Sequence, residues 1–219
     1  FAFIQYNQVI TGKVAAFVSP GSIESQNIII DPNSTVEVSA DPMLIIPKIN
    51  VNVPVRYDVG SDYDSQMAAM TNGVAHFAIP GANSHPGQIG NTVIAGHSSN
   101  DLFDNGDYKF IFAQLDRLQP GDTIYANYQS KRYTYIVTKK EIVKPTDVSK
   151  LVYETSKPIM TLVTCTPVGT AQSRLLVFAE QVNPDPNIAT AAPNSDETSS
   201  TNSIPGTAPT LLERLFGAN

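Results

Sequence analysis

The sequence contains no tryptophan and a single cysteine, Cys165, among its 219 residues. One thiol excludes an internal disulfide, and together with three scattered histidines it gives no spacing typical of a zinc site. We therefore expect no metal and no other cofactor. An unpaired thiol in an extracytoplasmic protein indicates reactivity, although a lone cysteine can also be a small buried core residue.

Basic residues and long apolar runs are also scarce. Lys and Arg number 14 against 20 Asp and Glu, which gives a net charge of −6. Because no basic cluster or stripe occurs, a nucleic-acid partner is not expected. No run of eighteen apolar residues is present, so no segment is predicted to span a membrane. The apolar start at Phe1 fits either the end of a removed anchor or an ordinary terminus.

The single cysteine follows an apolar strand signal. Residues 158–163 are mostly large and apolar, and Thr161 and Thr164 favour extended backbone, which predicts a buried strand that ends near Cys165. A turn signal at 166–169 follows, and a second apolar run, 175–179, begins directly after Arg174. A thiol and a guanidinium would then share one edge of a sheet, which is the arrangement that thioester chemistry needs.

The remaining patterns predict a mainly β fold. Further strands are expected at 43–56 (two short strands separated at 48–50), at 91–97, and at 123–128 and 132–137 as a hairpin. Helical signals are short and lie at 62–70, with Asp62 or Ser61 as the cap, at 108–118 and as one turn near 146–151. About eight short strands with brief helices indicate a closed or nearly closed β-barrel.

Composition divides the chain into three parts. We expect an N-terminal arm or leader at 1–42, a β-barrel at 43–182, and a low-complexity tail at 183–219. The end of that tail places Leu211, Leu212, Leu215 and Phe216 on one helical face. The acidic loop with Asp101, Asp104 and Asp107 lacks the pattern of a calcium loop, so we interpret it as solvated.

Three motifs in order resemble the sortases, the cysteine transpeptidases of bacterial cell surfaces. The first is Thr-Leu-Val-Thr-Cys at 161–165, with Arg174 nine residues beyond the cysteine. The second is the strand and histidine at 90–97, and the third is the opening pair of strands at 46–55. The resemblance covers roughly residues 43–182 and implies the sortase-type β-barrel.

The resemblance also assigns catalytic roles. Cys165 would be the nucleophile, His97 the acid/base, and Arg174 the cation that positions substrate or stabilises the oxyanion. The alternatives are a structural histidine and a surface ion pair for the arginine. His76 and His85 lie outside these motifs and are interpreted as structural or loop residues.

The implied donor substrate is a surface protein or pilin with a sorting signal like Leu-Pro-x-Thr-Gly, cleaved between Thr and Gly. The acyl group, held as a thioester, would pass to an amine of a lipid-linked cell-wall precursor or of a subunit lysine. The apolar part of the signal needs an apolar groove. The residues expected to line it are Ala95, Val143, Pro145, Val148, Leu151, Val163 and Thr164. For the residues at 143–151, the alternative is that they only pack this connection onto the barrel.

Several alternatives stay open. A surface thiol peptidase would let water hydrolyse the same thioester, a pilin-polymerising sortase would use a subunit lysine, and a non-catalytic β-barrel adhesin would use neither. Ser98 to Asn100, after the histidine, differ from the pattern of pilin-type members and leave the subclass open. The resemblance further implies a protein at the outer face of a bacterial plasma membrane, held by an N-terminal anchor.

Overall fold

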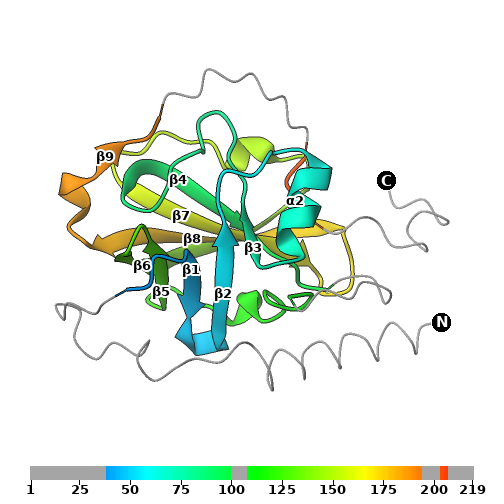
Figure 1. Ribbon diagram of the computed structural model, residues 1–219. Helices are drawn as coiled ribbons and strands as arrows, with labels where there is room; N and C mark the ends of the chain where they lie inside the picture. Colours follow the sequence, from blue (N-terminus) through cyan, green and yellow to red (C-terminus); the bar gives the residue numbers. More distant parts are fainter. Residues whose placement is uncertain (1–37, 100–107, 194–202, 207–219) are drawn as a thin grey trace, which may run out of the picture.

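A computed structural model describes residues 38–99, 108–193 and 203–206 (Figure 1). The predictions for most of the N-terminal arm, for the acidic loop at 101–107 and for the helical face at 211–216 lie outside these ranges. None of the helices within them is long and apolar enough to cross a membrane.

Eight strands form a closed barrel, in the order β3-β2-β1-β5-β6-β8-β7-β4, with β4 pairing back onto β3. This confirms the predicted mainly β, closed architecture with short helices. A short ninth strand, β9 (Thr190–Ala191), pairs in parallel with the start of β4. The barrel strands are β1 (Met43–Ile46), β2 (Val51–Arg56), β3 (Val74–His76), β4 (Gln88–Ala95), β5 (Thr123–Tyr128), β6 (Lys131–Val143), β7 (Pro158–Thr166) and β8 (Ser173–Asn183).

Two local predictions are confirmed with their expected causes. Helix α2 (Tyr63–Met70) is capped by Asp62, whose carboxylate accepts a hydrogen bond from the Ser65 backbone N–H at 3.0 Å. Strands β5 and β6 form the expected hairpin. Gln129 and Ser130 have φ values of 49° and 59°, which is the left-handed pair that a tight two-residue turn requires.

The helix predicted at 108–118 is wrong. That stretch forms successive turns, and only η3 (Leu115–Arg117) is helical. The N–H of Phe112 donates to the carbonyl of His97 at 2.9 Å, so it is not available to a helical ladder. Leu115, at the start of η3, and Leu118, just after it, are fully buried in the barrel interior although no α-helix forms. The other short helices are η2 (Pro47–Ile49), η4 (Val148–Lys150), which matches the predicted turn near 146–151, and η5 (Pro186–Ile188).

Two hydrophobic clusters lie on opposite faces of β4, β7 and β8. On β8, Leu175 and Val177 face the barrel interior, whereas Leu176 and Phe178 belong to a second cluster outside it. Residues of α2 and of the connection between β6 and β7 complete this outer cluster. Because strand side chains alternate between faces, Arg174 shares the outer face with Leu176. The functional residues must therefore be sought on the outside of the barrel.

Candidate functional site

The three predicted catalytic residues lie in one row across adjacent strands. Cys165 is paired with Arg174 in the antiparallel β7–β8 ladder. In the parallel β4–β7 ladder Ala95 is paired with Val163, and continuing that register by two residues brings His97 level with Cys165. The order across the sheet is therefore histidine, cysteine, arginine. Strand β7 extends to Thr166, so Cys165 lies within the strand rather than after its end.

Gly96 fixes the position of His97. Its N–H donates to the Val163 carbonyl at 3.0 Å, and its own carbonyl accepts a hydrogen bond from the Thr164 hydroxyl at 2.8 Å. A Cβ at this position would lie 2.6 Å from Cδ2 of Phe112. Only glycine therefore allows this close approach of backbone and ring. This explains why a glycine directly precedes His97 in the motif.

The catalytic candidates are protected from solvent. The exposed fractions are 2% for Cys165, 4% for His97 and 5% for Arg174. The turn between the cysteine and arginine strands is tied to the loop after the histidine, because the Gly169 N–H donates to the Ser99 hydroxyl at 3.0 Å. The two loops that border the site are thus coupled to each other.

Arg174 binds backbone carbonyl oxygens. Its Nη1 donates to the carbonyls of Ala171 and Ser173 at 3.0 and 3.2 Å. Its Nε donates to the carbonyls of Ile204 and Pro205 at 3.2 and 3.0 Å. The guanidinium is therefore oriented toward a peptide backbone that crosses the site, which is the group that an acyl-transfer enzyme has to hold.

Most of the expected groove residues lie together. Val143 is paired with Arg174 across the β6–β8 ladder, next to the catalytic row. Val143, Leu151, Val163 and Ala95 belong to the outer cluster, and the half-buried Val148 packs against it. The Pro145 carbonyl accepts a hydrogen bond from the Ile204 N–H at 2.7 Å. Thr164 differs, since its hydroxyl is directed to the Gly96 carbonyl and supports the site from behind.

The connection that forms this wall is held to the barrel by a buried polar pair. The Asn91 side chain donates to the Leu151 carbonyl at 2.9 Å and accepts from the Thr161 hydroxyl at 2.8 Å. Asn91 and Thr161 are both fully buried. Sequence reasoning did not assign a function to this asparagine, because a polar residue inside an apolar strand carries no indication of its partner.

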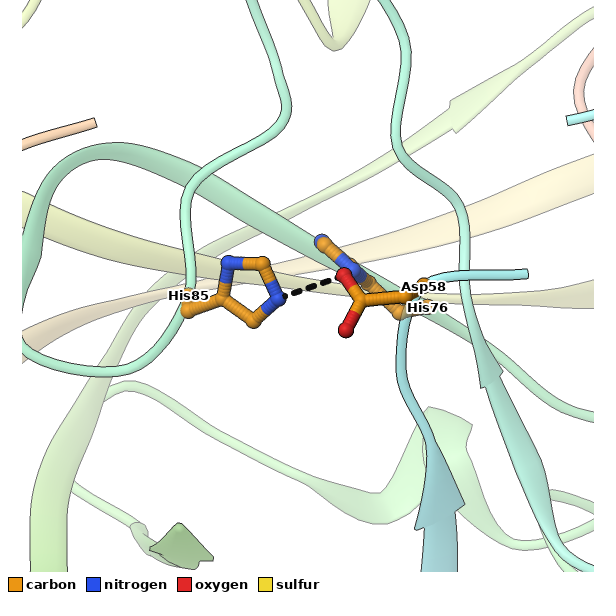
Figure 2. Close-up of side chains that lie close together, drawn as sticks. All are labelled: Asp58, His76 and His85. Atoms are coloured by element: carbon orange, nitrogen blue, oxygen red, sulfur yellow. Dashed lines mark hydrogen bonds and ion pairs between the residues drawn. The ribbon is translucent and has the colours of Figure 1, made fainter. Parts of the chain in front are cut away.

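Asp58, His76 and His85 form a second group of titratable side chains (Figure 2). Nε2 of His85 lies 3.0 Å from Oδ1 of Asp58, and the two histidine ring centroids are 4.9 Å apart. Burial lowers the pKa of His76 to about 3, with the charge of His85 acting in the same direction and Asp58 opposing it. The sequence analysis treated these histidines as scattered, whereas the fold brings them together.

Sequence reasoning also missed the contribution of the tail. Ile204 is 1% exposed and belongs to the outer cluster, and Gly206 lies against the catalytic row. The composition of residues 183–219 predicts a loosely packed tail. No local pattern in the sequence indicates which part of the tail packs against the barrel.

Comparison with known proteins agrees with this geometry. The family model described as the Sortase domain matches residues 44–182, which is more than half of the chain. Sortase D of Bacillus subtilis is 27% identical over 146 residues, covering 65% of this chain and 64% of its own. Sortase A of Streptococcus agalactiae is 27% identical over 164 residues, covering 75% and 62%. The chain thus spans less than two-thirds of the length of either relative.

Solved structures give the same fold. A lid mutant of sortase A from Corynebacterium diphtheriae is similar with a TM-score of 0.54 and 25% identity, covering 85% of this chain and 98% of its own. Sortase C from Clostridium perfringens, in a structure with the C-terminal cell wall sorting motif, has a TM-score of 0.53 and 21% identity over 82% and 88%. The latter likeness concerns the fold alone. Because the Sortase domain model matches residues 44–182, the chain belongs to the sortase family.

Proposed function

We propose that this protein is a cysteine transpeptidase that cleaves a Leu-Pro-x-Thr-Gly-type sorting signal and transfers the acyl group to an amine. The observation that supports this most strongly is that Arg174 lies opposite Cys165 in the β7–β8 ladder while His97 lies two residues beyond the end of β4, on the other side of β7. The family supports transpeptidation in general, whereas the signal and the acceptor are part of the proposal.

The proposed reaction has two halves. The Cys165 thiolate attacks the threonine carbonyl carbon, and the resulting tetrahedral intermediate collapses with cleavage of the Thr–Gly bond. His97 delivers the proton to the leaving amine. In the second half an acceptor amine attacks the thioester, gives its proton to His97 and releases Cys165 as thiolate. Each half exchanges one C–N bond and one C–S bond, so no cofactor is consumed.

Arg174 would hold the peptide and its developing negative charge. A guanidinium presents several donors in a rigid plane, and Arg174 already directs them at backbone carbonyls. Burial strengthens such hydrogen bonds because little water competes for the donors. The apolar lining near Val143, Leu151 and Val163 suits the Leu-Pro part of the signal.

Partners and location follow from the same proposal. The donor is a surface protein or pilin, and the acceptor is a lipid-linked cell-wall precursor or a subunit lysine. The enzyme would act at the outer face of a bacterial plasma membrane through an N-terminal anchor. The alternative of a thiol peptidase differs only in using water for the second half-reaction.

Product analysis separates these two functions. The enzyme is incubated with a Leu-Pro-x-Thr-Gly peptide, with and without an added amine such as triglycine, and the products are identified by mass. A transpeptidase forms the ligated peptide whenever amine is present. If only the free threonine acid forms at saturating amine, the protein is a hydrolase and the transfer proposal is rejected.

A further inference from the structure

The active site holds a piece of the protein's own chain. Ile204, Pro205 and Gly206 cross it, and the first two are buried. The Ile204 N–H is bonded to the Pro145 carbonyl, and the Ile204 and Pro205 carbonyls accept from Nε of Arg174. The segment thus both donates a backbone N–H and offers backbone carbonyls to the site, as a bound peptide ligand would.

The sequence of this segment has the pattern of the proposed donor. Residues 204–208 read Ile-Pro-Gly-Thr-Ala. Compared with Leu-Pro-x-Thr-Gly, isoleucine replaces its isomer leucine, glycine takes the variable place, and alanine adds one methyl group. The proline and threonine stand at matching positions. A second copy of this five-residue pattern does not occur elsewhere in the chain.

The register of the bound part agrees with that pattern. Ile204, at the place of the signal's leucine, lies among Val143, Leu151 and Val163 in the outer cluster. Gly206, which directly precedes the threonine in sequence, lies so close to the catalytic pair that an added Cβ would be 2.6 Å from Sγ of Cys165. The aliphatic residue therefore occupies the groove while the chain leads toward the nucleophile.

We propose that residues 204–206 are an intramolecular ligand of the acyl-donor site, which an external sorting signal must displace. This inference rests on the proposed function for the identity of the displaced peptide. A tethered ligand has an effective concentration on the order of millimolar. If it binds with a Kd about one tenth of that, it fills about nine sites in ten and raises the apparent KM of an external peptide about tenfold.

Two point variants of the full chain test this without touching the catalytic row. Gly206→Ala places a methyl group against Sγ of Cys165 and the Arg174 guanidinium, and Ile204→Asn removes the apolar anchor. The matched control is Ser203→Ala, because Ser203 is exposed. Both test variants should lower the KM for the peptide about tenfold with little change in kcat. They should also speed alkylation of Cys165 by iodoacetamide, and the control should do neither.

The two readouts separate this inference from the proposed function. Faster alkylation without any peptide acylation supports the intramolecular ligand and rejects the sorting-signal donor. Peptide acylation at one unchanged KM in all four proteins, with equal alkylation rates, overturns the intramolecular ligand. Cysteine-dependent loss of residues 208–219 from the incubated full chain also overturns it, because a consumed segment cannot act as a standing competitor.

A different observation carries a second inference, at the cluster of Asp58, His76 and His85 (Figure 2). One ligand atom from each residue lies within 4.8 Å of the others. The His76 ring is fully buried, and neither of its nitrogens makes a well-formed hydrogen bond within the described residues. Buried polar atoms are nearly always satisfied, so an imidazole with unsatisfied nitrogens beside two other possible ligands indicates a missing partner.

The surroundings hold these groups in place. Tyr57 contacts both histidine rings, with centroid distances of 5.2 and 5.3 Å, and Tyr128 stacks on His85 at 5.2 Å. Asp58 adopts a left-handed conformation, with φ of 57°, that aspartate tolerates better than most residues. Its side chain is 78% exposed and free to adjust. Tetrahedral zinc needs ligand atoms about 3.3 Å apart, and Nε2 of His85 and Oδ1 of Asp58 are already 3.0 Å apart.

We infer that Asp58, His76 and His85 bind a divalent first-row transition metal, with zinc as the ion that two imidazoles and one carboxylate suit best. The site has no part in the proposed acyl transfer. It would join the loop after β2 to the loop before β4 and stabilise the barrel at that point.

Titration of the full chain with Zn²⁺ and with Co²⁺ tests this. We expect one equivalent bound, a visible Co²⁺ absorption band, and a rise in Tm with Zn²⁺. His85→Gln and Asp58→Asn should each weaken binding at least tenfold, whereas His97→Asn, which changes the remaining histidine, should not. Binding that is lost in the His97 variant and kept in the other two, or no binding up to millimolar metal, overturns the inference.

Discussion

Arg174 lies directly opposite Cys165 in the ladder between β7 and β8, so the two side chains leave the sheet on the same face. Opposed residues in an antiparallel pair have Cα atoms about 4.5–5.5 Å apart. The nine residues from Cys165 to Arg174 are thus the length of chain that leaves β7, turns, and comes back to the position opposite Cys165 on β8. The spacing of the motif has a geometric cause, and His97 enters the row by the parallel register of β4.

Arg174→Lys should lose most of the acylation rate and Arg174→Ala nearly all of it. Loss of an oriented donor at an oxyanion site typically costs on the order of 100-fold, and lysine offers a compact charge on a flexible stem. The acylation rate of the peptide is measured at two salt concentrations. If the lysine variant acylates nearly as fast as wild type, and the alanine defect shrinks with salt, Arg174 only steers an acidic substrate.

Gly96→Ala should displace His97 and destabilise the barrel. The new methyl group would lie 2.6 Å from the Phe112 ring, and overpacking of this kind costs about 1–3 kcal/mol. Denaturant unfolding measures the loss, and the acylation rate should fall with it. Adding Phe112→Leu relieves the contact, so the double variant should be more stable than the sum of the two single changes predicts. Strict additivity would contradict this steric explanation.

Asn91→Ala should loosen the wall of the groove. The Leu151 carbonyl and the Thr161 hydroxyl would each lose a buried partner, which costs about 1–3 kcal/mol of unfolding free energy. The KM for the peptide should rise more than kcat falls, because Asn91 holds the groove and touches no reacting atom. Asn83→Ala is the control, since the Asn83 side chain donates to the Pro193 carbonyl, away from the groove residues. Equal kinetic effects of the two variants would count against the role of Asn91.

Local signals in the sequence were sufficient for much of the fold and for placing Cys165 and Arg174 on neighbouring strands. The strand before Cys165, the turn and the strand after Arg174 are each encoded by short patterns, and so are the β5–β6 hairpin and the Asp62 cap. The helix expected at 108–118 failed because tertiary contacts override periodicity. There, the Phe112 N–H donates to the carbonyl of His97 instead of to a carbonyl one turn earlier in a helix.

The two features behind the further inferences were beyond local patterns. Docking of Ile204 depends on a groove built from β6, β7 and the connection between them. The meeting of Asp58, His76 and His85 depends on the parallel pairing of β2 with β3 and the antiparallel pairing of β3 with β4. Such relationships between distant residues follow from topology, which three short strands do not determine by themselves.

Intact-protein mass spectrometry after mixing with a Leu-Pro-x-Thr-Gly peptide tests the central claim most directly. The wild-type chain should gain the mass of the Leu-Pro-x-Thr acyl group, and peptide mapping should place it on Cys165. Cys165→Ala should gain nothing while keeping its cooperative unfolding, because a truncated thiol changes core stability by about 1 kcal/mol or less. An adduct that persists in Cys165→Ala, or cleavage of the peptide at an unchanged rate in that variant, would contradict the account.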